Sequence, residues 1–180
     1  MKIMFASDIH GSKVYAEKLI ETFQKENAEL LVLLGDYLYH GPRNDLPEGY
    51  EPKEVIKILN AVKDKLLCIR GNCDGDVDQM VLDFSILNDT AVLLLDGKRA
   101  YLSHGHVKNP ENPLPMQKGD LLINGHTHVW KIEEYDNFTY LNPGSVTLPK
   151  EGQDNSYMVY ENKKFQIKSL KGEVLKEYSF

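Results

Sequence analysis

The chain has 180 residues, of which 42% are hydrophobic and 27% are charged, and this composition predicts one globular domain spanning residues 1–180. The 27 acidic residues outnumber the 21 basic ones, and the net charge of -6 disfavours extended nucleic-acid binding, which needs clustered positive charge. No apolar run approaches the roughly 20 residues that span a bilayer, and the N-terminus lacks a secretion signal, so we expect a cytoplasmic protein without a membrane partner.

The first half of the chain alternates predicted strands and helices. Residues 2–6 are typical of a buried strand, and Ser12 is suited to cap a helix that follows it. The apolar residues of this helix recur at helical spacing, at Ala16, Leu19, Ile20 and Phe23. A strand, a helix and a strand are predicted next, at residues 30–34, from Pro52 onward and at 66–69. Residues 37–51 contain two prolines and two glycines without periodicity, which indicates a surface loop.

The second half is predicted to be rich in strands. Short apolar or alternating runs are separated by turn signals, at residues 91–95, 98–103, 120–123, 138–141, 156–161, 163–170 and 174–178. We find no internal repeat and no linker, so the sequence does not support a second domain.

Five of the predicted strands end in side chains that can bind metal ions. These are Asp8 with His10, Asp36, Asn72, His104 with His106, and His126 with His128. Ligands of open α/β sheets bind beyond the carboxyl ends of the strands, so we expect these side chains to converge. A capped turn or a hydrogen-bonded histidine explains any single pair, but not a set that includes five of the six histidines.

Carboxylate, amide and imidazole groups together favour borderline divalent metals. Cys68 and Cys73 are unclustered and indicate neither a disulfide framework nor a thiolate zinc site. We therefore expect Mn²⁺ first, with Zn²⁺, Fe²⁺, Co²⁺ or Ni²⁺ as alternatives. The candidate ligands outnumber the roughly three or four that one catalytic ion takes from a protein. The sequence thus predicts two ions that share a carboxylate, a centre suited to hydrolysis.

The motifs also carry a family resemblance. Taken in order, Asp8-Ile9-His10, Gly35-Asp36, Gly71-Asn72-Cys73-Asp74, His104-Gly105-His106 and Gly125-His126-Thr127-His128 resemble the signature of the calcineurin-like metallophosphoesterases. Two further segments are similar to the YfcE-type small bacterial phosphodiesterases of that superfamily, His40-Gly41-Pro42-Arg43-Asn44 and Asn142-Pro143-Gly144-Ser145. The resemblance covers nearly the whole chain and implies an α/β fold, a four-layer αββα sandwich of two mixed β-sheets flanked by helices.

The resemblance implies a dinuclear centre with a metal-bridging hydroxide as nucleophile. By this resemblance, one ion would be bound by Asp8, His10 and His128, the other by Asn72, His104 and His126, and Asp36 would bridge both. We expect Gly125 to let the chain turn sharply, so that His126 and His128 reach different ions.

Other residues of these motifs have two interpretations each. Cys73 stands where most of the superfamily has a histidine, and a thiol with an ordinary pKa near 8.5 carries no positive charge at neutral pH. We interpret it as a packed side chain rather than a nucleophile, and we expect the chemistry to favour esters with good leaving groups. Asp74 either forms a turn or orients a ligand histidine. The candidate catalytic residues are Asp36, Asn72, Cys73 and Asp74. The candidate substrate-binding residues are His40 and Arg43, which surface exposure explains at least as well, and His106, which either contacts substrate or binds a metal through its backbone carbonyl.

The sequence predicts a metal-dependent phosphodiesterase that acts on a small phosphodiester. One alternative is a phosphomonoesterase or nucleotidase that uses the same site. Another is a non-catalytic protein-interaction scaffold, as in the retromer subunit related to this family. The presence of every ligand type favours the enzyme, while a homo-oligomeric state is left open.

Overall fold

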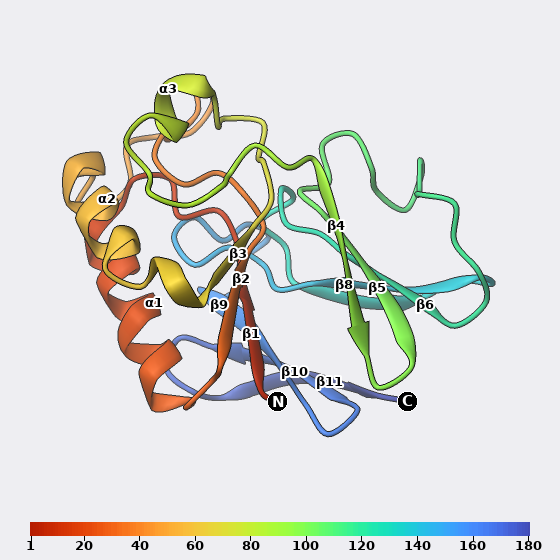
Figure 1. Cartoon of the computed structure of the whole chain (residues 1–180). Helices are drawn as coiled ribbons and strands as arrows, with labels where there is room; N and C mark the ends of the chain where they lie inside the picture. Colours follow the sequence, from red (N-terminus) through yellow and green to blue (C-terminus); the bar gives the residue numbers. More distant parts are fainter.

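Two mixed β-sheets pack face to face in the computed structural model, which describes all 180 residues (Figure 1). The six-stranded sheet, in the order β11-β10-β9-β1-β2-β3, consists of β1 (Ile3–Ala6), β2 (Leu30–Leu33), β3 (Leu66–Cys68), β9 (Ser156–Glu161), β10 (Lys164–Ser169) and β11 (Val174–Ser179). The five-stranded sheet, in the order β4-β5-β6-β8-β7, consists of β4 (Thr90–Leu95), β5 (Lys98–Ser103), β6 (Asp120–Ile123), β7 (Lys131–Glu134) and β8 (Phe138–Asn142).

The helices cover the outer face of the six-stranded sheet. They are α1 (Lys13–Lys25) and α2 (Pro52–Asn60), with the short α3 (Asp76–Gln79) and a 3-10 turn (Lys63–Lys65) in the connections (Figure 1). Ser12 caps α1 as predicted, because its Oγ accepts a hydrogen bond from the backbone N–H of Tyr15 at 3.3 Å. No helix of the protein has the length and apolar character needed to cross a membrane.

Strand β1 is buried on both faces, which explains its uninterrupted apolar sequence. Ile3 and Phe5 belong to the core between the two sheets, whereas Met4 and Ala6 pack in the core under the helices. The two sides of one strand therefore contribute to two cores and tie the sheets and helices together.

The predicted α/β class, the two mixed β-sheets and the predicted strands and helices are confirmed, whereas the fourth, outer helical layer is absent. The short α3 and strand β7 were not predicted, because Asp76–Gln79 and Lys131–Glu134 are too short and polar to show an apolar periodicity. On the outer face of the five-stranded sheet an irregular loop at residues 104–119 takes the place of a helix, and its Met116 packs against a cluster that includes Leu122.

The parallel strands place the candidate ligands at one end of the molecule. Strands β1, β2 and β3 run parallel in one sheet, and β5, β6 and β8 run parallel in the other. Main-chain hydrogen bonds join the loops that follow them, including Gly125 N to His104 O at 2.9 Å. The carboxyl ends of strands from both sheets therefore meet, as the sequence predicted.

Glu26, at the end of α1, anchors that helix to the six-stranded sheet. Its carboxylate accepts hydrogen bonds from Lys2 (2.6 Å), Lys168 (2.7 Å) and the Tyr157 hydroxyl (2.8 Å). Burial alone raises the pKa of Glu26, but the three donors outweigh it and lower the pKa from 4.5 to about 2. Because the folded-state pKa is lowered, this contribution to stability is complete above pH 4.5 and is lost as the pH falls toward 2.

We predict that Glu26→Gln lowers the free energy of unfolding by about 1 kcal/mol at neutral pH, with solvent screening of the partly exposed pairs taken into account. The free energies of unfolding of Glu26→Gln and the wild type should converge as the pH falls from 4.5 to about 2, as measured by urea unfolding. Glu21→Gln is the control, because Glu21 is 66% exposed and lies 3.8 Å from Lys25, and it should change little. An equal loss at every pH would contradict the prediction.

Candidate metal centre

The loops after five strands bring all seven candidate metal ligands together. Asp8 and His10 follow β1, Asp36 follows β2, Asn72 follows β3, His104 follows β5, and His126 and His128 follow β6. Asp8, His10, Asp36, His104 and His128 are buried, although carboxylates and imidazoles normally lie at the surface. Such burial requires charge partners.

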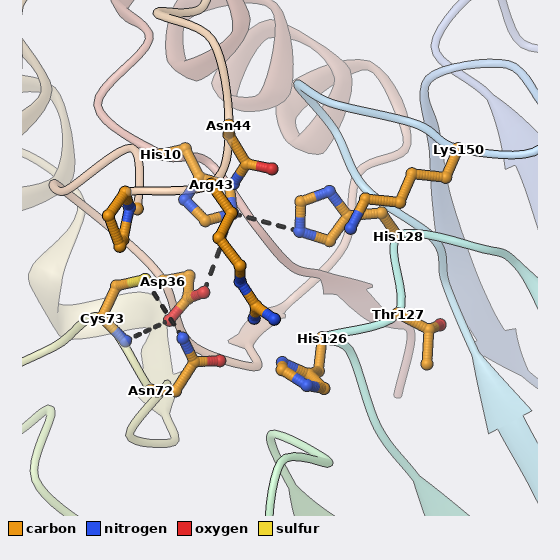
Figure 2. Close-up of a pocket in the computed structure, with 12 residues that line it drawn as sticks. His10, Asp36, Arg43, Asn44, Asn72, Cys73, His126, Thr127, His128 and Lys150 are labelled. Carbon is orange, nitrogen blue, oxygen red and sulfur yellow. Dashed lines mark hydrogen bonds and ion pairs between the residues drawn. The ribbon is translucent and has the colours of Figure 1, made fainter.

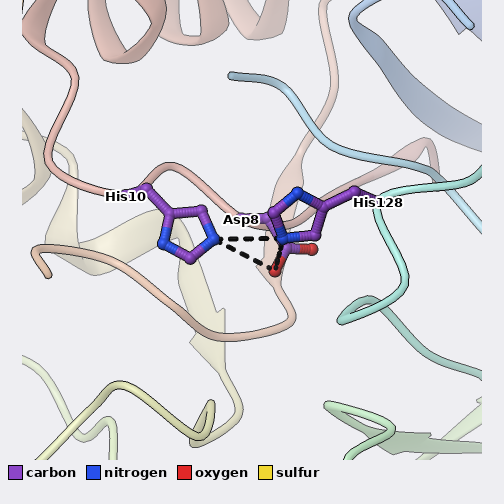
Figure 3. A group of neighbouring side chains, drawn as sticks. All are labelled: Asp8, His10 and His128. Atoms are coloured by element: carbon purple, nitrogen blue, oxygen red, sulfur yellow. Dashed lines mark hydrogen bonds and ion pairs between the residues drawn. The ribbon is translucent and has the colours of Figure 1, made fainter. Parts of the chain in front are cut away.

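One group of ligand atoms consists of Asp8, His10 and His128, whose donor atoms all lie within 4.8 Å of one another (Figure 3). Asp8 Oδ1 lies 3.3 Å from His128 Nε2 and 3.7 Å from His10 Nε2. The two Nε2 atoms are only 3.1 Å apart.

A second group forms around His104. Its Nε2 lies 3.1 Å from Asn72 Oδ1 and 3.2 Å from His126 Nδ1. Asp36 lies between the two groups, because its Oδ2 is 3.5 Å from His104 Nε2 and 3.7 Å from His10 Nε2. His126 thus faces the cluster with Nδ1, whereas the other three histidines face it with Nε2.

Backbone carbonyls determine the tautomer of three imidazoles. Nδ1 of His10 lies 2.8 Å from Tyr39 O, that of His104 lies 2.6 Å from Leu34 O, and that of His128 lies 2.6 Å from Leu148 O. A carbonyl oxygen only accepts, so in each neutral ring Nδ1 carries the hydrogen and Nε2 presents a lone pair to the cluster.

The donor set fits divalent cations. Two neutral Nε2 lone pairs that face each other at 3.1 Å repel, and Asp8 Oδ1 is a buried oxygen without a hydrogen-bond partner. Both features are resolved by a cation bound among these atoms, since imidazole nitrogen and carboxylate oxygen are ligands of borderline divalent metals.

The two buried carboxylates make the cluster attractive to positive charge. Burial alone lowers the pKa of His104, but Asp36 outweighs it and raises the pKa to about 9. Burial alone raises the pKa of Asp8, but its histidine partners hold it well below the usual range. His126, which is half-buried beside His104, has its pKa lowered to about 4 by burial and by that neighbour.

The main chain is strained at five of the seven candidate ligands. Their φ angles lie in the left-handed region, at 62° for Asp8, 50° for His10, 59° for Asp36, 67° for His126 and 60° for His128. Each such conformation costs a non-glycine residue on the order of 1 kcal/mol or more, and it persists only where the surrounding structure enforces it. These conformations direct side chains two positions apart, Asp8 with His10 and His126 with His128, toward the same cluster.

Two glycines are required by close contacts. A Cβ on Gly71 would lie 2.1 Å from Asp36 Oδ1, and one on Gly125 would lie 1.9 Å from Ser7 Oγ. The φ of Gly125 is outside the left-handed region, so the backbone conformation alone does not require glycine there, and its role in a sharp turn stays a prediction. The close contact does require it, because the loop with His126 packs directly on the loop with Asp8.

Asp74 organises the main chain around the bridging carboxylate. Its carboxylate accepts the backbone N–H groups of Asp36 (2.8 Å), Tyr37 (2.9 Å) and Gly71 (2.7 Å). Burial and the nearby Asp36 raise the pKa of Asp74 to about 6. Neither sequence-based interpretation, a turn former or an orienter of a histidine, describes this cross-link between the loops after β2 and β3.

Cys73 contacts the centre without supplying a charge. Burial and the neighbouring Asp36 raise the pKa of its thiol, so the thiol stays protonated at neutral pH. Its backbone N–H donates to Asp36 Oδ1 at 2.9 Å, and its Sγ accepts from Asn72 Nδ2 at 3.2 Å. These contacts agree with a packed side chain that positions its neighbours.

Residues 142–148 join the two ligand-bearing sides of the site. The bonds run from Asn142 Nδ2 to Gly125 O (2.8 Å), from Ser145 Oγ to Asp8 O (3.0 Å), from Thr147 Oγ1 to Ile9 O (2.8 Å) and from His128 Nδ1 to Leu148 O (2.6 Å). Residues 142–148, of which the resemblance named only Asn142 to Ser145, therefore hold the loop after β1 against the loop after β6.

A cavity of about 430 Å³ opens over the cluster (Figure 2). It is lined by His10, Asp36, Asn72, Cys73, His126 and His128 together with Gly41, Pro42, Arg43, Asn44, Thr127 and Lys150. Of the predicted substrate-binding residues, only Arg43 lines it. His40 lies between the rings of Tyr39 and Tyr50, and His106 is exposed outside the cavity. Sequence reasoning missed Lys150, since a single lysine after an unrecognised turn carries no signal.

Comparison with known proteins places the chain among phosphoesterases. A family model described as the calcineurin-like phosphoesterase superfamily domain matches residues 1–164. Phosphodiesterase YfcE of Escherichia coli (strain K12) is 46% identical over 170 residues, which cover 94% of this chain and 92% of that protein. A solved structure of E. coli Yfce, described as a phosphoesterase, superposes with a TM-score of 0.97 and 43% identity over 99% of both chains. The resemblance predicted from the motifs is confirmed.

A more distant structure shares the fold alone. Vacuolar protein sorting 29 from Cryptosporidium parvum superposes with a TM-score of 0.63 at 17% identity, over 99% of this chain and 98% of that one.

We predict that Gly125→Ala destabilises the fold by about 1–3 kcal/mol, because the new methyl group collides with Ser7 and comes within 3.0 Å of Asp8 Oδ2. It should also reduce the divalent metal bound per chain, since it displaces the Asp8 loop. Urea unfolding and elemental analysis measure the two effects. Gly75→Ala is the matched control, because its new Cβ would have no neighbour closer than 3.8 Å. Unchanged stability and metal content in Gly125→Ala would show that the loops are not in tight contact.

Proposed function

Because the chain belongs to the calcineurin-like phosphoesterase superfamily, we propose that it is a metal-dependent phosphodiesterase with a dinuclear centre. The observation that carries the proposal is the convergence of three carbonyl-oriented imidazoles on two buried carboxylates. The similarity to a phosphodiesterase over 94% of the chain supports the reaction class. A small phosphodiester is the proposed substrate, since the cavity over the cluster holds only about 430 Å³.

We propose that the ligands divide between two ions. Asp8, His10 and His128 would hold one ion, and Asn72, His104 and His126 would hold the other. Asp36 would bridge them, since its Oδ2 lies within 3.7 Å of a histidine of each group. Both sheets supply ligands, which supports residues 1–180 acting as one domain.

When bound, two divalent ions, with Mn²⁺ proposed first, would activate water as the nucleophile and offset negative charge on the phosphoryl group. The chain's own part is to orient the ligands. The Nδ1–H bonds to carbonyls keep the Nε2 lone pairs directed inward, and Asp74 holds the backbone of Asp36 in register. The neutral Cys73 thiol offers no positive charge to a leaving group, so esters of acidic alcohols should react best.

The two alternative functions explain the structure of the site less completely than a phosphodiesterase does. A phosphomonoesterase or nucleotidase would employ the same ligand set, and the substrate charge would separate it from a diesterase. A non-catalytic scaffold needs only the fold, which the chain shares with vacuolar protein sorting 29 of C. parvum. Buried, strained ligands with inward lone pairs favour an enzyme, because a scaffold gains nothing from such strain.

We predict that Asp36→Asn reduces hydrolysis of bis(para-nitrophenyl) phosphate by at least a thousandfold, since a neutral amide is a far weaker bridge between two cations. Release of para-nitrophenolate by the manganese-loaded proteins measures the rate, and elemental analysis measures the metal. Asp64→Asn, on the surface 3-10 turn, is the control and should keep full activity. No turnover by the loaded wild type would refute the proposed function.

His126→Ala should selectively empty one metal position. The expected stoichiometry is about one ion per chain against about two in the wild type, because the His126 ring contacts His104, and only its backbone N–H, which alanine keeps, bonds to Asp8. Elemental analysis after equilibrium dialysis provides the count, and the activity should fall with it. Loss of both ions together would argue against the division of His126 and His128 between two ions.

A further inference from the structure

Two cations face the cavity without partners in the protein. Arg43 comes from the loop at residues 37–51 and Lys150 from the loop after residues 142–148 (Figure 2). Neither side chain makes an ion pair, and both line the cavity beside the metal-ligand cluster, so their charges are available to a bound anion.

The position of Lys150 is determined by hydrogen bonds on both sides of it. Its backbone N–H donates to His128 O at 3.1 Å, and its carbonyl accepts from Gln153 N at 3.1 Å. Gln153 Oε1 in turn accepts from the backbone N–H of Trp130 at 2.6 Å. The lysine therefore extends from a loop that is fastened to the segment carrying the metal-ligand candidate His128.

The Arg43 loop is fastened in a similar way. Asn44 donates from its backbone to Gly41 O at 3.3 Å and from Nδ2 to His40 O at 2.8 Å. A Cβ on Gly41 would lie 3.3 Å from Cys73 Sγ, which places this turn against the metal-ligand loop after β3. The two cations thus enter the cavity from separate loops, each held against a different side of the cluster.

The remaining lining offers an organic group little apolar surface. Apart from the Pro42 ring and the Cys73 thiol, the cavity contains no aliphatic or aromatic side chain other than imidazoles. Asn44 and Thr127 add neutral polar groups. Selectivity among esters therefore depends on charge and hydrogen bonds rather than on hydrophobic burial.

A simple phosphodiester leaves this charge unused. Its one negative charge lies on the phosphoryl group that the metal-ligand cluster would hold. The guanidinium charge of Arg43 and the ammonium charge of Lys150 therefore remain for the rest of the substrate. We propose that Arg43 and Lys150 recognise a second acidic group, a carboxylate or phosphate, on the alcohol of the phosphodiester that is not released. This inference rests on the proposed function and narrows its substrate class to phosphodiesters with a further anionic substituent.

The test compares diesters that differ only in that substituent. Para-nitrophenyl propyl phosphate, whose propyl group is uncharged, is the reference, and the carboxyethyl and phosphonoethyl analogues add an acidic group at similar length. In each case water adds to phosphorus, the bond to the aryl oxygen breaks, and para-nitrophenol leaves with the alkyl phosphate as the other product. The wild type should show at least about fivefold higher kcat/KM for an acidic analogue at low salt. The preference should decline near 1 M salt, where the Debye length is only about 3 Å.

Variants separate recognition from structural support. Lys150→Met and Arg43→Met should each lower kcat/KM more for the acidic esters than for the propyl ester, so that the preference falls toward unity, and Lys150→Arg should retain it. Lys131→Met is the control and should keep the wild-type preference. Equal kcat/KM for the acidic and propyl esters in the wild type, or a preference that survives Lys150→Met and Arg43→Met, would overturn the proposal. So would an equal loss on all substrates in the variants.

Binding measurements keep this test independent of turnover. Propyl carboxyethyl phosphate and dipropyl phosphate have poor leaving groups, and calorimetry on the metal-loaded protein compares their affinities. Tighter binding of the acidic diester that disappears in Lys150→Met supports the proposal even if no aryl diester is hydrolysed, in which case only the proposed function fails. Equal affinities of the wild type for the two diesters would overturn the inference. They would not bear on the hydrolase activity, which the aryl diester assay tests separately.

Discussion

The site depends on three hydrogen bonds from imidazole Nδ1 to backbone carbonyls. His10, His104 and His128 each donate to a carbonyl of a loop or strand end, which fixes the tautomer and leaves a lone pair at Nε2. Without these acceptors the rings could turn and bond to Asp8 and Asp36 directly, and the site would close on itself. With them, the Nε2 lone pairs of the neutral rings face one another and the carboxylate oxygens. This arrangement is stabilised when a proton or a metal cation is bound among these atoms.

The two sheets are held at the distance that this arrangement requires. Packing of Phe5 and neighbours against the inner face of the five-stranded sheet brings the strand ends together, and residues 142–148 fasten the loops that follow. The fit leaves no room for a methyl group at Gly71 or Gly125. Left-handed φ angles at Asp8, Asp36 and three histidines are sustained by this tight fit. The close contacts between the loops therefore maintain the strained backbone at the ligands.

The groups around the metal-ligand cluster differ in whether they carry a positive charge. Cys73 is neutral and Asp74 is occupied by three backbone N–H groups, so neither contributes a positive charge to a departing alcohol. The unpaired charges over the cavity belong to Arg43 and Lys150, on loops outside the ligand motifs. The loops therefore place positive charge over the cavity separately from the ligand motifs.

The sequence by itself determined the secondary-structure elements and the family, because both follow from the order of residues within short segments. Alternation, helical spacing and polar residues at strand ends placed the strands, α1, α2 and the candidate ligands from Asp8 to His128. Only the tertiary structure decided that Lys150 lines the cavity, that His40 and His106 do not, and that Gly125 is required by its contact with Ser7. The physical reason is that these properties depend on contacts between residues more than a hundred positions apart, such as Ser145 with Asp8, and no local pattern records which loops will meet.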